Sequence, residues 1–527
     1  MCKEKRINIV CIAICILIAC AVFIYVGQNK RISFCDEIYS YTITNSDRAT
    51  YQFDVNTIYS RDEIVDMLSH GSGDSIVGTL KNVASDKVHP PLYYVFMYIA
   101  SVIFGGHSKW IGLGVNMIFL LGTVVLMWLF VYDITRDRML SILALMVYLF
   151  NMSTLSDAML IRMYMQMTFF VMAFLYCDNR LKDDEKKRRI YPWLTAVTVG
   201  GFLTQYYFAF FAMAFFVVEF FINRKNNMAK VKTYFFSMLT AVGVSTLIWP
   251  LWIPSMLFNS HAGSIAESAV DFRHFFVRIY EAFRTLQVSI FQKAYAAGMI
   301  FFVVLCVVFF LSKRVREYRT GIRNLVIKMV AALLAYSILV RILTPDYLTS
   351  PRYYYAAQML EIVSIIVMLY SLITEYAVKH AVCVSACVCV LLIAGDVCGY
   401  AFGYGIDYYG NAKVYDERME KLGEYSDAMW VLTDYNSYRL DAMVNYLCIP
   451  EYVAVIDTGD AAEYNRLDEL NGVDRTVIIS LEHMVNYETV DFSDRGLYFL
   501  IAATGRFAKS ELLFSEDGVR VYEAELQ

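Results

Sequence analysis

Two neighbouring carboxylates, Asp36 and Glu37, are the first residues of this chain whose type and position suggest chemistry. They lie in the stretch Phe34 to Tyr41, shortly after an apolar segment that is long enough to cross a membrane. Two interpretations fit this position. The pair could be solvated carboxylates beyond a helix end, or one of them could be a general base that takes a proton from an acceptor hydroxyl.

Two arginines occupy positions where a cation needs a partner. Arg162, followed by Met163 and Tyr164, lies within an apolar segment, where it must find a carboxylate, a phosphate or a carbonyl. Arg352 opens a run of three tyrosines, beginning at Tyr353, at the expected outer start of a helix. Tyrosines are also common in the aromatic belts of membrane interfaces, so the tyrosines alone decide nothing.

A third motif, His89-Pro90-Pro91, precedes Leu92, Tyr93 and Tyr94 and opens an apolar segment. Proline is tolerated at a helix start, where its missing N–H costs least, so the motif predicts a helix entry. His89 is then either incidental or a ligand-binding residue.

The composition predicts that these residues belong to a membrane protein. The chain has 527 residues, is 58% hydrophobic and 16% aromatic, and contains only 8 prolines. Apolar segments recur from Ile7 to Phe402, which predicts an α-helical polytopic bundle of about 11 to 13 transmembrane helices. Lys and Arg cluster in the segments 180–189, 224–232 and 313–323, which we expect to be cytoplasmic; the Asp36 loop then lies outside.

The chain divides into two predicted domains. Residues 1–402 form the transmembrane domain, with a large first extracytoplasmic loop at 27–88 that includes one amphipathic stretch, Arg61 to Ser69. Residues 403–527 carry 24 Asp and Glu against 10 Lys and Arg, so this tail is of a different kind and is expected outside the membrane.

Short β-rich runs alternate with helical patterns in the tail and predict a small α/β domain. The predicted strands are Trp430 to Thr433, Tyr452 to Ile456, Thr476 to Ser480, Leu497 to Ala502 and Arg520 to Glu523, and the predicted helices are Tyr438 to Leu447 and Ala461 to Leu470.

Several functions are disfavoured. Basic residues lie between apolar segments, where membrane topology explains them, so nucleic acid is not expected as a partner. The 12 cysteines lie mostly inside apolar segments and the 7 histidines are scattered, so neither a disulfide framework nor a zinc site is predicted.

Taken in order, these motifs resemble the GT-C glycosyltransferases, in particular the branch of protein O-mannosyltransferases and aminoarabinose transferases of lipid A. The shared features are the acidic pair after the first helix, the long external loop, His-Pro-Pro-Leu-Tyr-Tyr, Arg-Met-Tyr and Pro-Arg-Tyr near the last segments. The similarity covers about residues 1 to 400; the acidic tail matches no feature of that family.

The resemblance implies transfer of a sugar from a polyprenyl-phosphate donor to an acceptor hydroxyl at the outer face of the cell membrane, usually with inversion. Asp36 would be the base and Glu37 would assist it or bind the acceptor. Arg162 and Arg352 would stabilise the departing phosphate. Further substrate-binding candidates are His89, Tyr93, Tyr164 and Tyr353.

No cofactor is required by this scheme, although a divalent cation could bind the acidic pair. The acceptor could be a glycan, a protein or a lipid, and membrane lipids surround the multi-pass chain. Two alternatives remain at this point: a transporter or flippase of a lipid-linked glycan, and a non-catalytic scaffold whose tail binds a partner.

Overall fold

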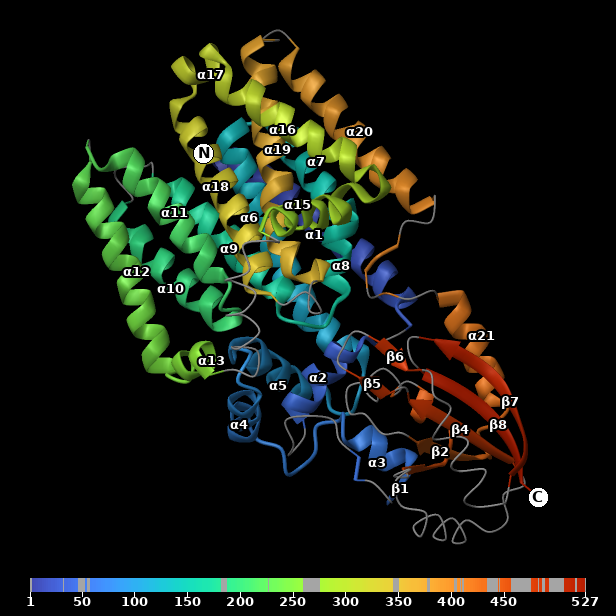
Figure 1. Ribbon diagram of the computed structural model, residues 1–527. Helices are drawn as coiled ribbons and strands as arrows, with labels where there is room; N and C mark the ends of the chain where they lie inside the picture. Colours follow the sequence, from blue (N-terminus) through green and yellow to red (C-terminus); the bar gives the residue numbers. More distant parts are fainter. Residues whose placement is uncertain are drawn as a thin grey trace. The chain divides into compact units, whose positions relative to one another are not determined.

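The computed structural model is mostly helical and separates into two compact units (Figure 1). It describes residues 2–31, 33–45, 53–54, 57–181, 187–225, 227–258, 275–344, 350–376, 380–401, 405–407, 409, 412–433, 444, 446–455, 475–481, 483–485, 489–491, 507–516 and 519–526. The helical unit comprises residues 1–28, 86–93 and 113–407, and the loop–tail unit comprises residues 29–85, 94–112 and 408–527.

The helical unit is built from helices, most of them apolar. They are α1 (Cys2–Asn29), most of α6 (Lys109–Thr135), α7 (Arg138–Phe150), α8 (Met152–Met159), α9 (Tyr164–Arg180), α10 (Lys187–Thr204), α11 (Phe208–Asn223), α12 (Met228–Ile248), α13 (Trp252–Phe258), α15 (Phe275–Phe291), α16 (Tyr295–Leu311), α17 (Lys313–Tyr318), α18 (Thr320–Leu343), α19 (Tyr355–Tyr376) and α20 (Ala381–Ala401), with the short 3-10 helices η2 (Gln292–Ala294) and η4 (Pro351–Tyr354).

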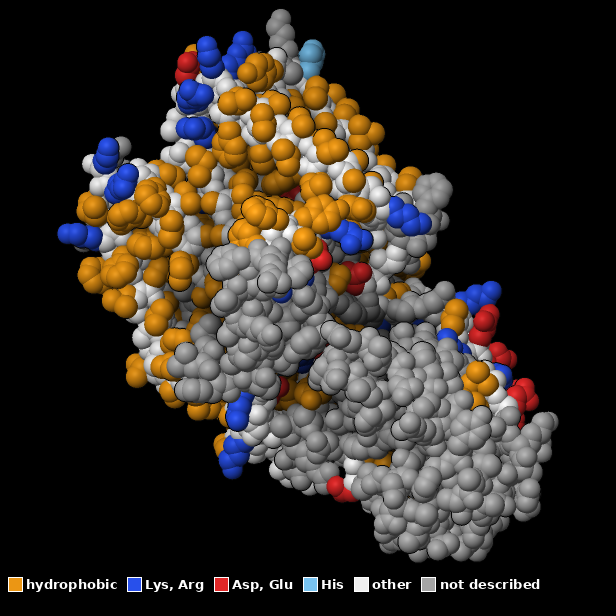
Figure 2. Space-filling view, viewed as in Figure 1, with side chains coloured by type: hydrophobic (Ala, Val, Ile, Leu, Met, Phe, Trp, Pro, Cys, Tyr) orange, Lys and Arg blue, Asp and Glu red, His pale blue; other side chains and the backbone are white. Residues whose placement is uncertain are grey.

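Seven segments of the described chain are long and apolar enough to cross a membrane, or eight if the bent pair α7–α8 is one span. The larger number expected from the sequence, 11 to 13, includes helices that miss this test, such as α9 and α11, with 17 and 16 residues. Apolar side chains cover the visible faces of these helices, and Lys and Arg gather near α17 (Figure 2). The chain is a multi-pass membrane protein.

Helix α19 lies at the centre of the helical unit, with most of its side chains buried. It packs against α7, α9, α16, α18 and α20. One buried cation among these helices is paired with carboxylates: Lys328 of α18 lies 2.9 Å from both carboxylate oxygens of Asp178 in α9 and also bonds Glu219 in α11. The helices that carry the site therefore belong to one packed core.

The loop–tail unit contains a mixed sheet of six strands in the order β1-β3-β2-β4-β8-β7, with a separate β5–β6 pair (Figure 1). The strands are β1 (Thr57–Ser60), β2 (Met429–Thr433), β3 (Tyr452–Val455), β4 (Arg475–Leu481), β5 (His483–Val485), β6 (Thr489–Asp491), β7 (Phe507–Glu516) and β8 (Val519–Leu526). Strands β3, β2 and β4 are parallel, and the other pairs are antiparallel. The remaining elements are α2 (Cys35–Asn45), α3 (Arg61–Asp66), most of α4 (Ile76–Asp86) and α5 (Leu92–Phe104), and α21 (Ala412–Gly423).

The predicted α/β character of the tail is confirmed, and four of its five predicted strands correspond to β2, β3, β4 and β8. The predicted strand at 497–502 and the helix at 461–470 lie outside the described residues, as does most of the helix at 438–447. Strand β7 and helix α21 were not predicted.

The domain boundaries differ from those predicted. The division at 402/403 moves to 407/408, and the loop expected to belong to the transmembrane domain groups with the tail. The physical reason is strand pairing: β1, from the loop, adds antiparallel to β3, and Arg61 then donates a 3.1 Å hydrogen bond from Nε to the carbonyl of Pro450. The amphipathic stretch from Arg61 corresponds to the short helix α3.

Candidate functional site

In the loop–tail unit, Asp36 and Glu37 occupy the first turn of α2, where negative charge interacts favourably with the helix dipole. Glu37 is fully buried and accepts a 2.7 Å hydrogen bond from the backbone N–H of Phe34, in the manner of a capping residue. The same carboxylate oxygen lies 3.0 Å from Nζ of Lys30, which is also buried. Glu37 therefore fixes the start of α2, whereas Asp36 stays partly exposed.

The rest of α2 is held by hydrogen bonds from other parts of the loop–tail unit. Tyr41 donates its hydroxyl to the carbonyl of Ser108 at 2.8 Å, and burial raises the pKa of this phenol. Near the other end of α2, Asn82 donates to the carbonyl of Ile43 at 3.1 Å. The backbone that carries Asp36 is thus anchored at both ends.

In the helical unit, Asp86, His89 and Arg162 form a chain of hydrogen bonds. Nδ1 of His89 lies 2.7 Å from Oδ2 of Asp86, which also accepts the backbone N–H of His89 at 3.0 Å. Nη2 of Arg162 lies 3.1 Å from Nε2 of His89. Because a guanidinium can only donate, this geometry assigns a neutral imidazole with its proton on Nδ1.

The charges of Asp86 and Arg162 are shaped by the burial of the three hydrogen-bonded residues. Burial by itself would raise the pKa of Asp86, but the interaction with His89, together with the charge of Arg162, outweighs it and lowers the pKa to about 2. Asp86 is therefore ionised at any physiological pH and fixes the orientation of the imidazole. Arg162 is only 3% exposed, so its charge acts in a medium of low polarity.

Arg162 lies in the short connection between α8 and α9, and neighbouring elements hold this connection in place. Asn116 of α6 donates from Nδ2 to the carbonyls of Ala158 at 3.1 Å and Leu160 at 2.6 Å. Thr168 of α9 donates to Asp157 of α8 at 2.6 Å. Arg162 is buried, but it lies in a connection and not, as the sequence had suggested, within a helix. The sequence predicted a carboxylate, phosphate or carbonyl as its partner, whereas the structure shows a bond to a histidine.

Arg352 and the tyrosines form an aromatic cluster in the same unit. The guanidinium of Arg352 lies 5.4 Å from the ring centre of Tyr353, within cation–π range. Tyr353 meets Tyr164 edge to face at 5.9 Å and Tyr207 at 6.2 Å. Because Tyr164 follows Arg162 by two residues, the two arginine motifs meet through this tyrosine pair.

Asp407, at the end of the helical unit, secures the same region. Its backbone N–H donates to Oγ of Ser156 in α8 at 2.9 Å, and the hydroxyl of Tyr355 donates to its carboxylate at 3.3 Å. Burial raises the pKa of Asp407, and the bond from Tyr355 only partly opposes this. Asp407 therefore connects the end of the helical unit to α8, the short helix that precedes Arg162.

The structure thus brings together five of the sequence candidates, by direct contact or close chain adjacency: His89, Arg162, Tyr164, Arg352 and Tyr353. Tyr93 is fully buried near the start of α5. Asp36 and Glu37 belong to the other unit.

Sequence reasoning missed Asp86, Lys30 and Asn116. Asp86 could have been found, because it precedes His89 by three residues, a spacing that brings a carboxylate and an imidazole together across one turn.

The contacts of Glu37 do not favour a metal ion at Asp36 and Glu37, because the Glu37 carboxylate already bonds Lys30 and a backbone N–H. Among the described residues, no group of three or more His, Cys, Asp and Glu side chains is arranged to hold a metal ion.

The comparisons with known proteins identify the fold alone. Neither a family model nor a curated protein matches this sequence. Among solved structures, those of one transferase are similar in fold to this chain.

The particular likeness is to ArnT from Cupriavidus metallidurans, an aminoarabinose transferase. The structure bound to undecaprenyl phosphate matches with a TM-score of 0.53 at 9% identity, covering 97% of both chains. The apo structure matches with a TM-score of 0.50 at 12% identity, again over 97% of both chains. This confirms the fold expected from the sequence motifs.

Proposed function

We propose that this chain is a glycosyltransferase of the cell membrane that moves a sugar from a polyprenyl-phosphate donor to an acceptor hydroxyl on the extracytoplasmic face. The observation that carries the proposal is the buried, preorganised cation: Arg162 is bonded to a neutral histidine whose tautomer is fixed by Asp86. Similarity of fold to ArnT bound to undecaprenyl phosphate supports it.

The reaction is a single displacement with inversion. The acceptor oxygen forms a bond to the anomeric carbon, the bond from that carbon to the phosphate oxygen breaks, and the acceptor proton passes to Asp36. Polyprenyl phosphate leaves as an anion, so the step needs positive charge more than a strong general acid. Arg162 and Arg352 supply that charge, and no metal ion is required.

The binding roles follow from contacts within each unit. Nε2 of His89 is taken by Arg162, so we assign His89 as a positioning residue that orients the guanidinium. Tyr164 and Tyr353 offer aromatic faces and hydroxyls to the sugar or the phosphate. We assign Tyr93 to binding of the sugar donor because it closely follows the His-Pro-Pro motif.

Within the acidic pair, Asp36 is the proposed base and Glu37 holds it in place. Glu37 cannot leave its ion pair with Lys30 without leaving a buried charge unpaired, which costs several kcal/mol, roughly 3 to 5 in other proteins. A partly exposed carboxylate next to a fixed one is a suitable arrangement for proton transfer, because only Asp36 can approach a substrate.

The test uses purified full-length protein and a radiolabelled polyprenyl-phosphate sugar, with envelope glycans, proteins and lipids offered as separate acceptors. We expect release of polyprenyl phosphate and labelling of one acceptor class. Asp36→Asn should abolish transfer while donor binding persists, and Asp66→Asn in the same loop serves as control. Movement of intact donor across vesicles without release of polyprenyl phosphate would instead indicate a flippase, and full activity of Asp36→Asn would remove the assigned base.

A further inference from the structure

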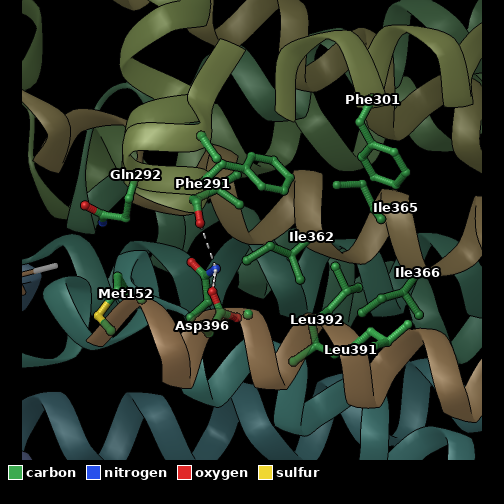
Figure 3. Close-up of a pocket in the computed structure, with 16 residues that line it drawn as sticks. Met152, Phe291, Gln292, Phe301, Ile362, Ile365, Ile366, Leu391, Leu392 and Asp396 are labelled. Carbon is green, nitrogen blue, oxygen red and sulfur yellow. Dashed lines mark hydrogen bonds between the residues drawn. The ribbon is translucent and has the colours of Figure 1, made fainter. Parts of the chain in front are cut away.

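The helical unit contains an elongated pocket of about 250 Å³ that the proposed reaction does not use (Figure 3). It is bounded by the end of α7, by the α15–η2–α16 corner and by α19 and α20. Its lining is mostly aliphatic and aromatic, but three polar side chains, Asn151, Gln292 and Asp396, also face it.

Asn151 organises the polar side of the pocket. It lies at the 64° break between α7 and α8, where its side-chain oxygen Oδ1 accepts the backbone N–H of Ser153. Its Nδ2 donates to the carbonyl of Ile290 at 3.2 Å and to Oδ1 of Asp396 at 3.1 Å (Figure 3). In the described part of the chain, Asn151 is the one hydrogen-bond partner of Asp396, and this bond leaves the second carboxyl oxygen for a ligand.

The positions of Asn151, Gln292 and Asp396 relative to the helix ends place these three polar side chains at a similar depth in the bundle. Asp396 lies five residues, or about 7 Å, before the end of α20, Asn151 follows the end of α7, and Gln292 comes just before the start of α16. Helices α7 and α20 run toward this depth, and α16 runs away from it.

The apolar lining lies deeper along the same helices. Phe301 is six residues into α16, about 9 Å, and Leu391 is ten residues before the end of α20, about 15 Å. The two side chains are 38% and 71% exposed, so the apolar part opens sideways where α16 and α20 face lipid. The pocket has the shape and polarity of a site for an amphiphile that enters from the bilayer.

We propose that this pocket binds a neutral membrane lipid with a hydroxyl head group, such as a diacylglycerol. An acyl chain lies between α16 and α20, and the hydroxyl bonds the carboxyl group of Asp396. A hydroxyl can donate to a carboxylate or accept from a carboxylic acid, whereas a lipid phosphate would meet an acidic group with no Lys or Arg in the lining. This site is separate from the donor chemistry and does not depend on the proposed function.

The experiment uses full-length protein in nanodiscs and a diacylglycerol with a photoreactive group midway along one acyl chain. We expect saturable labelling of peptides from α16 and α20. Unlabelled diacylglycerol should compete, and phosphatidic acid with the same chains should compete at least tenfold less well. Equal competition by phosphatidic acid, or stronger competition by an alkylammonium amphiphile, would overturn the hydroxyl assignment.

Gly395 provides a variant that fills the pocket without a clash. A Cβ at this position would meet no atom within 4 Å, and a helix interior favours other residues over glycine. Gly395→Leu should reduce labelling at least tenfold. Gly243→Leu in α12, where a Cβ is equally unobstructed, is the matched control and should label normally. Equal labelling of the two variants would place the lipid elsewhere.

Asp396→Leu separates the head-group contact from the chain groove. This variant should still be labelled, but diacylglycerol and phosphatidic acid should now compete equally. A retained preference for diacylglycerol would show that Asp396 does not determine the selectivity of the pocket for the lipid head group.

Discussion

Replacing Asp86 by Asn tests whether the carboxylate behind His89 controls the use of a polyprenyl-phosphate donor. Asn has nearly the same shape and can still accept the backbone N–H of His89, which now bonds Oδ2 at 3.0 Å. It removes the charge that fixes the proton of the imidazole on Nδ1. We expect Arg162 to lose its fixed orientation, so that donor KM rises while the protein still inserts.

The magnitude is that of one hydrogen bond to a charged group. Such a bond contributes about 1.5 to 3 kcal/mol, so a loss of about 2 kcal/mol from donor binding raises KM about 30-fold. Burial alone would raise the pKa of Asp86, but His89 and Arg162 lower it from 3.8 to about 2 and so stabilise the charged form in the folded protein. Because the pKa is lowered on folding, this stabilisation is fully present above about pH 4 and is lost only as the pH falls toward 2. Asp86 should therefore contribute no step to the activity profile between pH 5 and 9.

The assay measures kcat and donor KM for release of polyprenyl phosphate by purified protein. Asp74→Asn is the matched control, because Asp74 also lies near a histidine, with Nδ1 of His70 at 3.6 Å, in the same loop region. Unchanged donor KM in a folded Asp86→Asn protein would refute the reasoning. So would equal losses in the two variants, because the effect would then belong to the loop and not to the Arg162 site.

Four further predictions follow from other contacts. Lys30→Met leaves a buried carboxylate on α2 without its cation and should cost roughly 3 to 5 kcal/mol of stability, seen as a lower midpoint of thermal unfolding in detergent. Asn116→Leu removes two buried hydrogen bonds to the carbonyls of Ala158 and Leu160, and should raise donor KM more than it lowers kcat because the connection carrying Arg162 loosens; equal changes in both would contradict this. His89→Glu should pair directly with Arg162 and weaken donor binding more than His89→Gln does, measured by competition with unlabelled polyprenyl phosphate. Chelation of divalent cations should leave transfer unchanged, and a loss restored by added Mg²⁺ or Mn²⁺ would contradict the metal-independent scheme.

Much of the fold could be predicted from the sequence because its signals are local. Apolar segments predict membrane helices, and alternating β-branched residues predict the strands of the tail. Arg162 could be singled out because a cation inside an apolar segment is costly, and it proves to be buried and hydrogen-bonded. Arg352 and Tyr353 could be grouped because they are adjacent in the chain.

The rest of the fold and of the site could not be predicted, because it depends on contacts that the sequence pattern does not reveal. Nothing in Thr57 to Ser60 indicates that these residues pair with β3 near the other end of the protein, so the loop could not be assigned to the tail's sheet. The partnership of Glu37 with Lys30 was also hidden, because it requires the turn between α1 and α2 to bring the two side chains together. The residues alone therefore did not distinguish the two adjacent carboxylates, which only the family resemblance separated, although Asp36 is partly exposed and Glu37 is buried.

The order of the groups in the Asp86–His89–Arg162 chain explains why it suits an anionic ligand. A carboxylate bonded directly to Arg162 would offset most of its positive potential at the guanidinium itself. Placing a neutral imidazole between them moves the negative charge one side chain further away, while still fixing the guanidinium through hydrogen bonds of 2.7 and 3.1 Å. Relative to a direct ion pair with Asp86, this order leaves Arg162 more of its attraction for a phosphate, and Asp86 still offsets part of the free-energy cost of burying the cation.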